Sequence, residues 1–126
     1  MAALSNVHAA SILNSSLRSG TYYLALFLTD PTPNATGTEA SGGGYARKII
    51  SFDAPALVNG RQQVKNQGSV DYGVITADIG DIAYWGILDS QVGGNLLWFG
   101  PFSRAKSVLN GDAITISPGA IVCTLS

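Results

Sequence analysis

Few side chains in this sequence could carry out chemistry. The chain has one histidine, His8, and one cysteine, Cys123. A lone histidine cannot build a histidine cluster for zinc within one chain, and no nucleophile-elbow pattern accompanies it. Cys123 lies in an apolar segment without a basic neighbour in sequence, which predicts a buried and unreactive thiol. We therefore expect no enzyme, no cofactor and no metal site.

The carboxylates are spread along the chain instead of being paired. Aspartates stand beside the predicted turns, where the side chain can accept hydrogen bonds from nearby backbone amides. Their spacing lacks the alternating ligands of a calcium loop and the paired carboxylates of a glycosidase. The aspartates at predicted turns are Asp30, Asp53, Asp78, Asp81, Asp89 and Asp112.

A run of three glycines, Gly42 to Gly44, invites comparison with a phosphate-binding loop. The comparison fails because a predicted strand follows, not a helix, and no Gly-Lys-Ser or Gly-Lys-Thr motif is present. We interpret the run as a tight turn that needs positive φ or close backbone approach. Tyr45 is then expected to anchor the first position of a strand over residues 45–52.

The segment from Ser5 to Leu17 is predicted to be a short helix. Ser5 is a favourable N-cap residue, and Ala9, Leu13 and Leu17 recur at a spacing of four, which gives one apolar stripe. Such a short helix is marginal alone and must pack on something. Two alternatives stay open: it covers the chain's own sheet, or it is an arm whose Leu13 and Leu17 contact a neighbouring subunit.

Most of the remaining chain has the pattern of short strands separated by Gly, Pro, Asn and Asp. The run over 21–29 is apolar at almost every position, so it is either central in a sheet or its outer face meets another surface. Residues 62–66 are expected to form an edge strand, and Gly100-Pro101 is expected to end the strand before it. The other expected strands cover 70–76, 82–88, 96–99, 103–109, 113–116 and 120–125.

This pattern predicts a mainly β fold, an antiparallel β-sandwich or jelly-roll-like domain with one short N-terminal helix. We expect a single domain over residues 1–126, in which 1–20 form the N-terminal helix or arm. Asn59-Gly60 is expected to be a tight turn, and residues 82–99 a hairpin.

Composition limits the partners. Only 12% of residues are charged and the net charge is −1, and without a basic run we expect no nucleic-acid binding. No apolar run reaches the roughly 20 residues that span a bilayer, and no basic segment precedes an apolar one at the N-terminus. We therefore expect neither a membrane partner nor a secretory signal. A low charge suits a surface packed against neighbours.

The remaining candidate contacts are charged or polar. Three basic pairs either lie on solvated strand faces or form salt bridges to acidic patches on neighbouring subunits: Arg47-Lys48, Arg61-Lys65 and Arg104-Lys106. The loop between the first two strands is long by ordinary standards, and long loops are often functional. Its candidate contact residues are Asp30, Asn34 and Glu39.

Four segments carry a resemblance to a known family: LALFLTDPT, GTEASGGGYARKIISF, GILDSQVGGNLLWFGPF and GDAITISPGAIVCTL. The chain resembles a family of small structural proteins of tailed bacteriophages, often labelled tail-fibre-like proteins. The segment with GTE, SGG and YAR is the most specific part. The resemblance implies a non-enzymatic component of the virion, assembled in the host cytoplasm.

Three hypotheses follow. The first is a capsid decoration, or cement, protein that forms a trimer with copies of itself and clamps the major capsid protein. The second is a tail or tail-fibre component that contacts other tail proteins and the host surface. The third is a small carbohydrate-binding module with an aromatic platform built from Tyr22, Tyr23, Tyr84, Trp85, Trp98 and Phe99.

Overall fold

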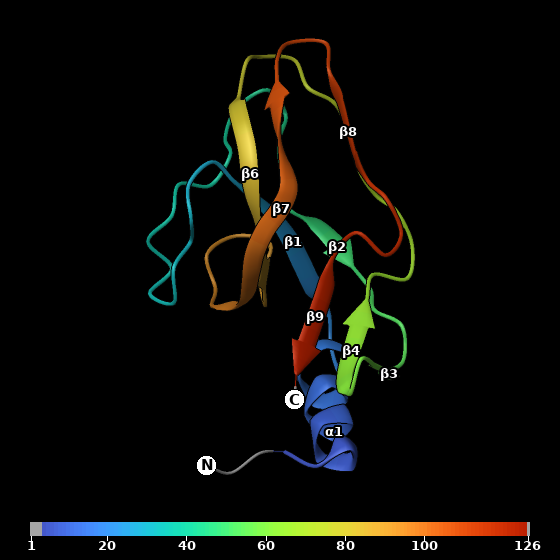
Figure 1. Cartoon of the computed structure of the whole chain (residues 1–126). Coiled ribbons are helices and arrows are strands. Elements are labelled where there is room, and N and C mark those ends of the chain that lie inside the picture. Colours follow the sequence, from blue (N-terminus) through green and yellow to red (C-terminus); the bar gives the residue numbers. More distant parts are fainter. Residues whose placement is uncertain (1–3, 126) are drawn as a thin grey trace.

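The computed structural model describes residues 4–125, and this part of the chain is mainly antiparallel β structure with one short helix (Figure 1). This confirms the predicted fold class. The elements are α1 (Asn6–Leu17), β1 (Tyr22–Phe27), β2 (Lys48–Ile50), β3 (Ala56–Val58), β4 (Arg61–Lys65), β5 (Val70–Val74), β6 (Gly80–Leu88), β7 (Leu96–Val108), β8 (Ala113–Ile116) and β9 (Val122–Leu125).

The strands form three sheets. The main sheet has four strands in the order β2-β1-β6-β7, a second sheet has the order β3-β4-β9, and a third consists of β5 and β8. In Figure 1, α1 lies with β3, β4 and β9 at one end of the molecule, while β6 begins and β7 ends at the opposite end. Both smaller sheets pack through one hydrophobic core against the main sheet, which gives a sandwich-like layout.

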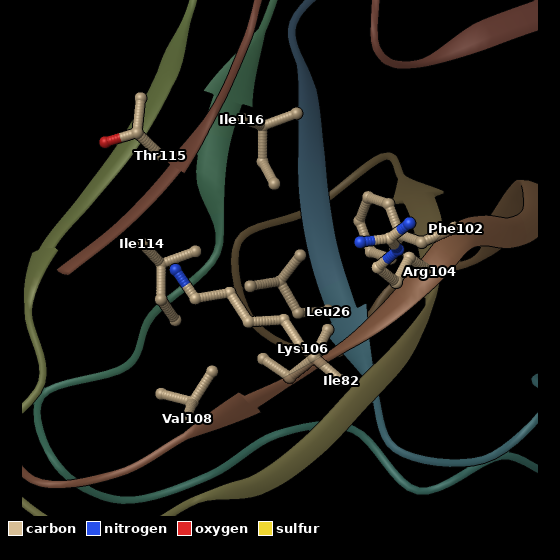
Figure 2. A pocket seen from close by; sticks show the side chains of 9 residues that line it. All are labelled: Leu26, Ile82, Phe102, Arg104, Lys106, Val108, Ile114, Thr115 and Ile116. Carbon is tan, nitrogen blue, oxygen red and sulfur yellow. The ribbon is translucent and has the colours of Figure 1, made fainter. Parts of the chain in front are cut away.

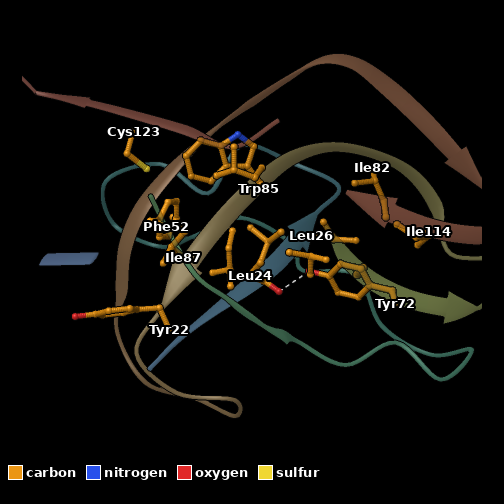
Figure 3. Close-up of a cluster of buried hydrophobic side chains, with 14 of the residues drawn as sticks. Tyr22, Leu24, Leu26, Phe52, Tyr72, Ile82, Trp85, Ile87, Ile114 and Cys123 are labelled. Atoms are coloured by element: carbon orange, nitrogen blue, oxygen red, sulfur yellow. Dashed lines mark hydrogen bonds between the residues drawn. The ribbon is translucent and has the colours of Figure 1, made fainter. Parts of the chain in front are cut away.

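The core forms around β1 because this strand is apolar on both faces. Leu24 and Leu26 are fully buried and pack with Tyr72 and Ile114 of the β5-β8 sheet (Figure 3). Side chains alternate along a strand, so Ala25 and Phe27 point to the other face, where they form a separate small cluster with Leu88. The prediction of a strand buried on both faces is therefore confirmed.

Helix α1 packs on its own chain. The Ser5 side chain accepts a hydrogen bond from the His8 amide (3.1 Å), which confirms the predicted cap. The apolar stripe lies against β4 and β9, and Leu13 and Leu17 are 0% and 1% exposed in the main core. This corrects the expectation that these two leucines contact a partner, because their side chains are already covered within the chain.

Two strands differ from the sequence prediction. β4 is central in its sheet and not an edge strand, because the distant β9 pairs with it on the side away from β3. β7 continues through Gly100-Pro101 as one strand with irregular register. Proline is tolerated there because β7 lies at a sheet edge, and a side chain on Gly100 would lie 2.8 Å from the Trp85 ring.

The Asn59-Gly60 turn is confirmed. Both residues have positive φ, 51° and 78°, and they connect β3 and β4 as a two-residue hairpin. Positive φ at both central positions is the geometry of the hairpin turns that fit the twist of the flanking strands.

One buried polar side chain, Asn66, joins the end of β4 to the chain before β9. Its amide nitrogen donates to the carbonyls of Gly68 and Ser117, both at 2.9 Å, and its amide oxygen accepts from the Ile121 amide at 2.9 Å. The residue is 1% exposed. Removing the side chain would leave buried backbone groups without partners.

We predict that Asn66→Ala lowers the free energy of unfolding by roughly 2–4 kcal/mol, because each buried group left without a hydrogen bond costs about 1–3 kcal/mol. Chemical denaturation followed by tryptophan fluorescence measures this loss. Gln67→Ala, at the exposed neighbouring position, is the matched control and should change stability by less than about 0.5 kcal/mol. Equal stability of the two variants would contradict the role given to Asn66.

Candidate functional site

The most specific segment of the sequence forms a cluster that we call the loop clamp: Glu39, Tyr45 and Arg47 with the carbonyls of Ser90 and Gly93. Arg47 binds Glu39 with two hydrogen bonds, Nε to Oε2 at 3.0 Å and Nη2 to Oε1 at 2.9 Å. Its Nη1 donates to the carbonyls of Ser90 (2.9 Å) and Gly93 (2.7 Å). The clamp thus ties the loop after β1 to the loop between β6 and β7.

Arginine suits this position because its planar fork of donors matches a carboxylate and leaves further donors free. The side chains of Arg47 and Glu39 are only 11% and 25% exposed. The hydrogen bond to Glu39 raises the pKa of Arg47 above its usual value. Arg47 therefore stays protonated, and the contacts of both side chains lie inside the chain.

Tyr45 extends the clamp into the core. Its hydroxyl donates to Glu39 Oε2 (2.8 Å) and accepts from the Leu26 amide (3.0 Å). Its ring stacks on Tyr72, with centroids 5.8 Å apart and planes 9° apart, and the Tyr72 hydroxyl donates to the Leu24 carbonyl (2.6 Å). Burial raises the pKa of both tyrosines. Tyr45 anchors the loop before β2 and is not the first residue of a strand, which corrects the prediction.

The glycine run fits a close approach at Gly43. Its φ is +62°, and a side chain there would lie 2.8 Å from the Ile75 side chain and 2.9 Å from the Ala77 backbone. Its carbonyl accepts a hydrogen bond from the Thr76 amide at 3.0 Å. The prediction of turn chemistry is confirmed at this position.

Two residues that were predicted to contact a partner belong to the loop clamp. Glu39 was expected to contact a partner from the long loop and Arg47 from the second strand, but each is bound within the chain. Asp30 and Asn34 are exposed in the same loop, and Asp30 accepts a hydrogen bond from the Thr32 amide at 3.0 Å. These two side chains remain predicted contacts.

The other basic candidates lie elsewhere. Lys48 is half-buried on β2, whereas Arg104 and Lys106 are exposed on β7. Glu39–Arg47 is the one ion pair within residues 4–125, so none of these three has a carboxylate within salt-bridge distance in that range. Their contact with a partner remains a prediction.

The residues that could do chemistry lie apart. His8 is exposed on α1, while Cys123 is 1% exposed in the core and burial raises its pKa to about 12. Within the described chain, no three His, Cys, Asp or Glu side chains gather as metal ligands would. The helix of this range is also too short to cross a bilayer.

The predicted aromatic platform is split. Tyr22 and Trp85 are 9% and 6% exposed and belong to the main core. Phe99 pairs with Gly86, the neighbour of Trp85, so it lies on the opposite face of the sheet. Trp98 packs against the main core and donates its ring N–H to the Ser16 hydroxyl (2.9 Å). The six rings therefore do not form one sugar-binding surface.

A different apolar surface was missed by the sequence prediction. The register places Tyr23 beside Ile49 and Leu88, and the neighbouring row places Phe99 beside Gly86. Ile49 and Phe99 are 61% and 37% exposed. We call this side of the main sheet the outer face. The alternation in residues 45–52, which puts Ile49 opposite Phe52, was the signal that could have found it.

The internal clamp and the apolar outer face suit a structural or binding protein. Residues 3–124 match the family model Gp80, described as podophage GP4 fiber I protein gp80, and the chain belongs to this family. The protein is therefore a phage structural protein and a component of the virion. The family confirms the resemblance to tail-fibre-like proteins. Comparison with curated proteins gives no match.

We predict that Arg47→Ala lowers the free energy of unfolding by roughly 2–4 kcal/mol, because it leaves the partly buried Glu39 carboxylate without its cation. Thermal unfolding followed by circular dichroism measures the loss. Arg61→Ala, at the exposed end of β4, removes the same charge and is expected to change stability by about 0.5 kcal/mol or less. Equal losses for the two variants would show that the clamp adds no specific stability.

We also predict that the Cys123 thiol reacts with Ellman's reagent only as fast as the chain opens. Burial raises its pKa in the folded chain, so its contribution to stability is complete below the ordinary thiol pKa and falls as the pH rises above it. The reaction is followed at pH 8, with and without denaturant, by the absorbance of the thionitrobenzoate that the reagent releases. A Ser107→Cys variant supplies an exposed thiol as control. Fast labelling of Cys123 in the native protein would contradict its burial.

Proposed function

We propose that the protein is a subunit of a podophage fibre. The observation that supports this is the match of residues 3–124 to a family described as a fibre protein. The match favours the tail-fibre alternative over the cement hypothesis, which the sequence had placed first. The cement hypothesis has no comparable support in the family's description.

The size of the chain argues for a subunit and not a whole fibre. A compact chain of 126 residues has a radius of gyration of about 14 Å, too small for a shaft. A fibre built from this chain therefore needs contacts to copies of itself or to other virion proteins. The expected trimer is one arrangement that provides them.

The outer face is the surface that best suits such assembly. It exposes Ile49 and Phe99, beside the half-buried Tyr23 and Tyr84. Rows of exposed apolar side chains on a sheet are typical of surfaces that a partner covers. The loop after β1, with exposed Asp30 and Asn34, is the proposed contact to the host.

Immunogold labelling of intact particles tests the proposal, with antibody raised against this chain and negative-stain imaging. We expect gold at the tail fibres. Gold spread over the head would instead support the cement hypothesis, and the absence of gold from all particles would contradict both. Particles of an unrelated phage are the control for non-specific labelling.

A further inference from the structure

A small pocket opens between β7 and β8 (Figure 2). Its floor is part of the hydrophobic core and includes Leu26, Ile82 and Ile114, which are 0%, 4% and 3% exposed. Arg104 and Lys106 of β7 and Thr115 of β8 line it closer to solvent. The pocket is thus a recess that lies directly over the core of the sandwich.

The opening exists because two sheet edges meet without pairing. β7 bonds to β6 alone and β8 to β5 alone, so neither strand completes its ladder across the pocket. One side-chain hydrogen bond bridges the two edges: Lys106 Nζ donates to the Ala113 carbonyl at 3.3 Å. Backbone donors and acceptors on such edges can receive an added strand.

The charges beside the pocket are unbalanced. Arg104 and Lys106 are exposed and, within residues 4–125, have no carboxylate within salt-bridge distance. On the far side of β8, Asp71 of β5 accepts a hydrogen bond from the Thr115 hydroxyl at 3.5 Å. Two cations without a carboxylate partner in that range, beside an apolar floor, attract a ligand that combines an apolar group with carboxylates.

The size of the pocket defines the apolar group. Its volume is about 180 Å³. An apolar cavity of about 150 Å³ is large enough to hold benzene. The pocket therefore fits one aromatic ring or one branched aliphatic side chain.

We propose that this pocket is a docking site for an extended acidic segment of a partner protein. The segment lies between β7 and β8, inserts one aromatic side chain into the pocket and places flanking carboxylates near Arg104 and Lys106. The inference goes beyond the proposed function: it rests on the pocket alone and holds whether the protein lies at the tail or on the head.

Peptide titration followed by two-dimensional amide NMR tests the proposal. The probe is a blocked five-residue peptide with the order Asp-Val-Phe-Val-Asp, and its controls replace both aspartates by lysine or the phenylalanine by alanine. We expect shifts centred on residues 103–108 and 113–116, with binding at least tenfold weaker for either control. Raising the salt concentration should weaken the binding of the acidic peptide, because salt screens its attraction to the two cations.

Two variants separate charge from shape. Arg104→Glu with Lys106→Glu should reverse the preference between the acidic and basic peptides, whereas Arg61→Glu with Lys65→Glu changes the same charge on β4 and should leave it unchanged. Ile116→Trp fills the pocket without altering its charge and should abolish binding of the acidic peptide and of the basic peptide. The amide spectra of the free variants show whether each is folded.

Three outcomes would overturn the proposal. Equal binding of the acidic and basic peptides would remove the role of the cations, and shifts confined to other parts of the chain would remove the site. Concentration-dependent shifts of these residues without peptide would assign the pocket to a second copy of this chain instead. Gold labelling tests the fibre separately, so the two proposals can fail independently.

Discussion

The ion pair between Glu39 and Arg47 is the interaction on which the arrangement of the loops depends. Glu39 itself forms an isolated antiparallel bridge with Phe27, so its carboxylate stands at a fixed position beside the end of β1. Arg47 reaches that carboxylate from the start of β2 and holds two carbonyls of the β6-β7 loop at the same time. One guanidinium therefore gives three segments a common reference point, and Tyr45 connects that point to the core through its stack on Tyr72.

Away from the clamp, the structure leaves several surfaces incomplete. The facing edges of β7 and β8 do not pair, the outer face of the main sheet exposes Ile49 and Phe99, and Arg104 and Lys106 lie beside an apolar pocket. A free monomer usually blocks such edges and covers such faces. A protein that matures by assembly has no need to do so, which agrees with its membership in a fibre family.

Local patterns predicted the local parts of this fold well. The capped helix, the Asn59-Gly60 turn and the doubly buried β1 each depend on neighbouring residues, so their signals lie within a few positions. The errors came from distant partners. β4 is central because β9 pairs with it. Gly100 lies within a strand and is glycine because the Trp85 ring leaves no room for a side chain there. Glu39 and Arg47 were predicted to contact a partner, and spacing alone could not show that they bind each other.

The pairing of β4 with β9 has a consequence for the order in which the protein becomes structured. The β3-β4 hairpin can form as soon as it leaves the ribosome, but β9 is synthesised almost at the end of the described chain. Helix α1, although made first, packs on both of these strands and so waits for the last of them. Distant pairing of this kind slows folding and leaves apolar strands exposed meanwhile. The nascent chain therefore exposes its helix stripe and strand edges until β9 has been synthesised, and that interval is when chaperone binding protects it best.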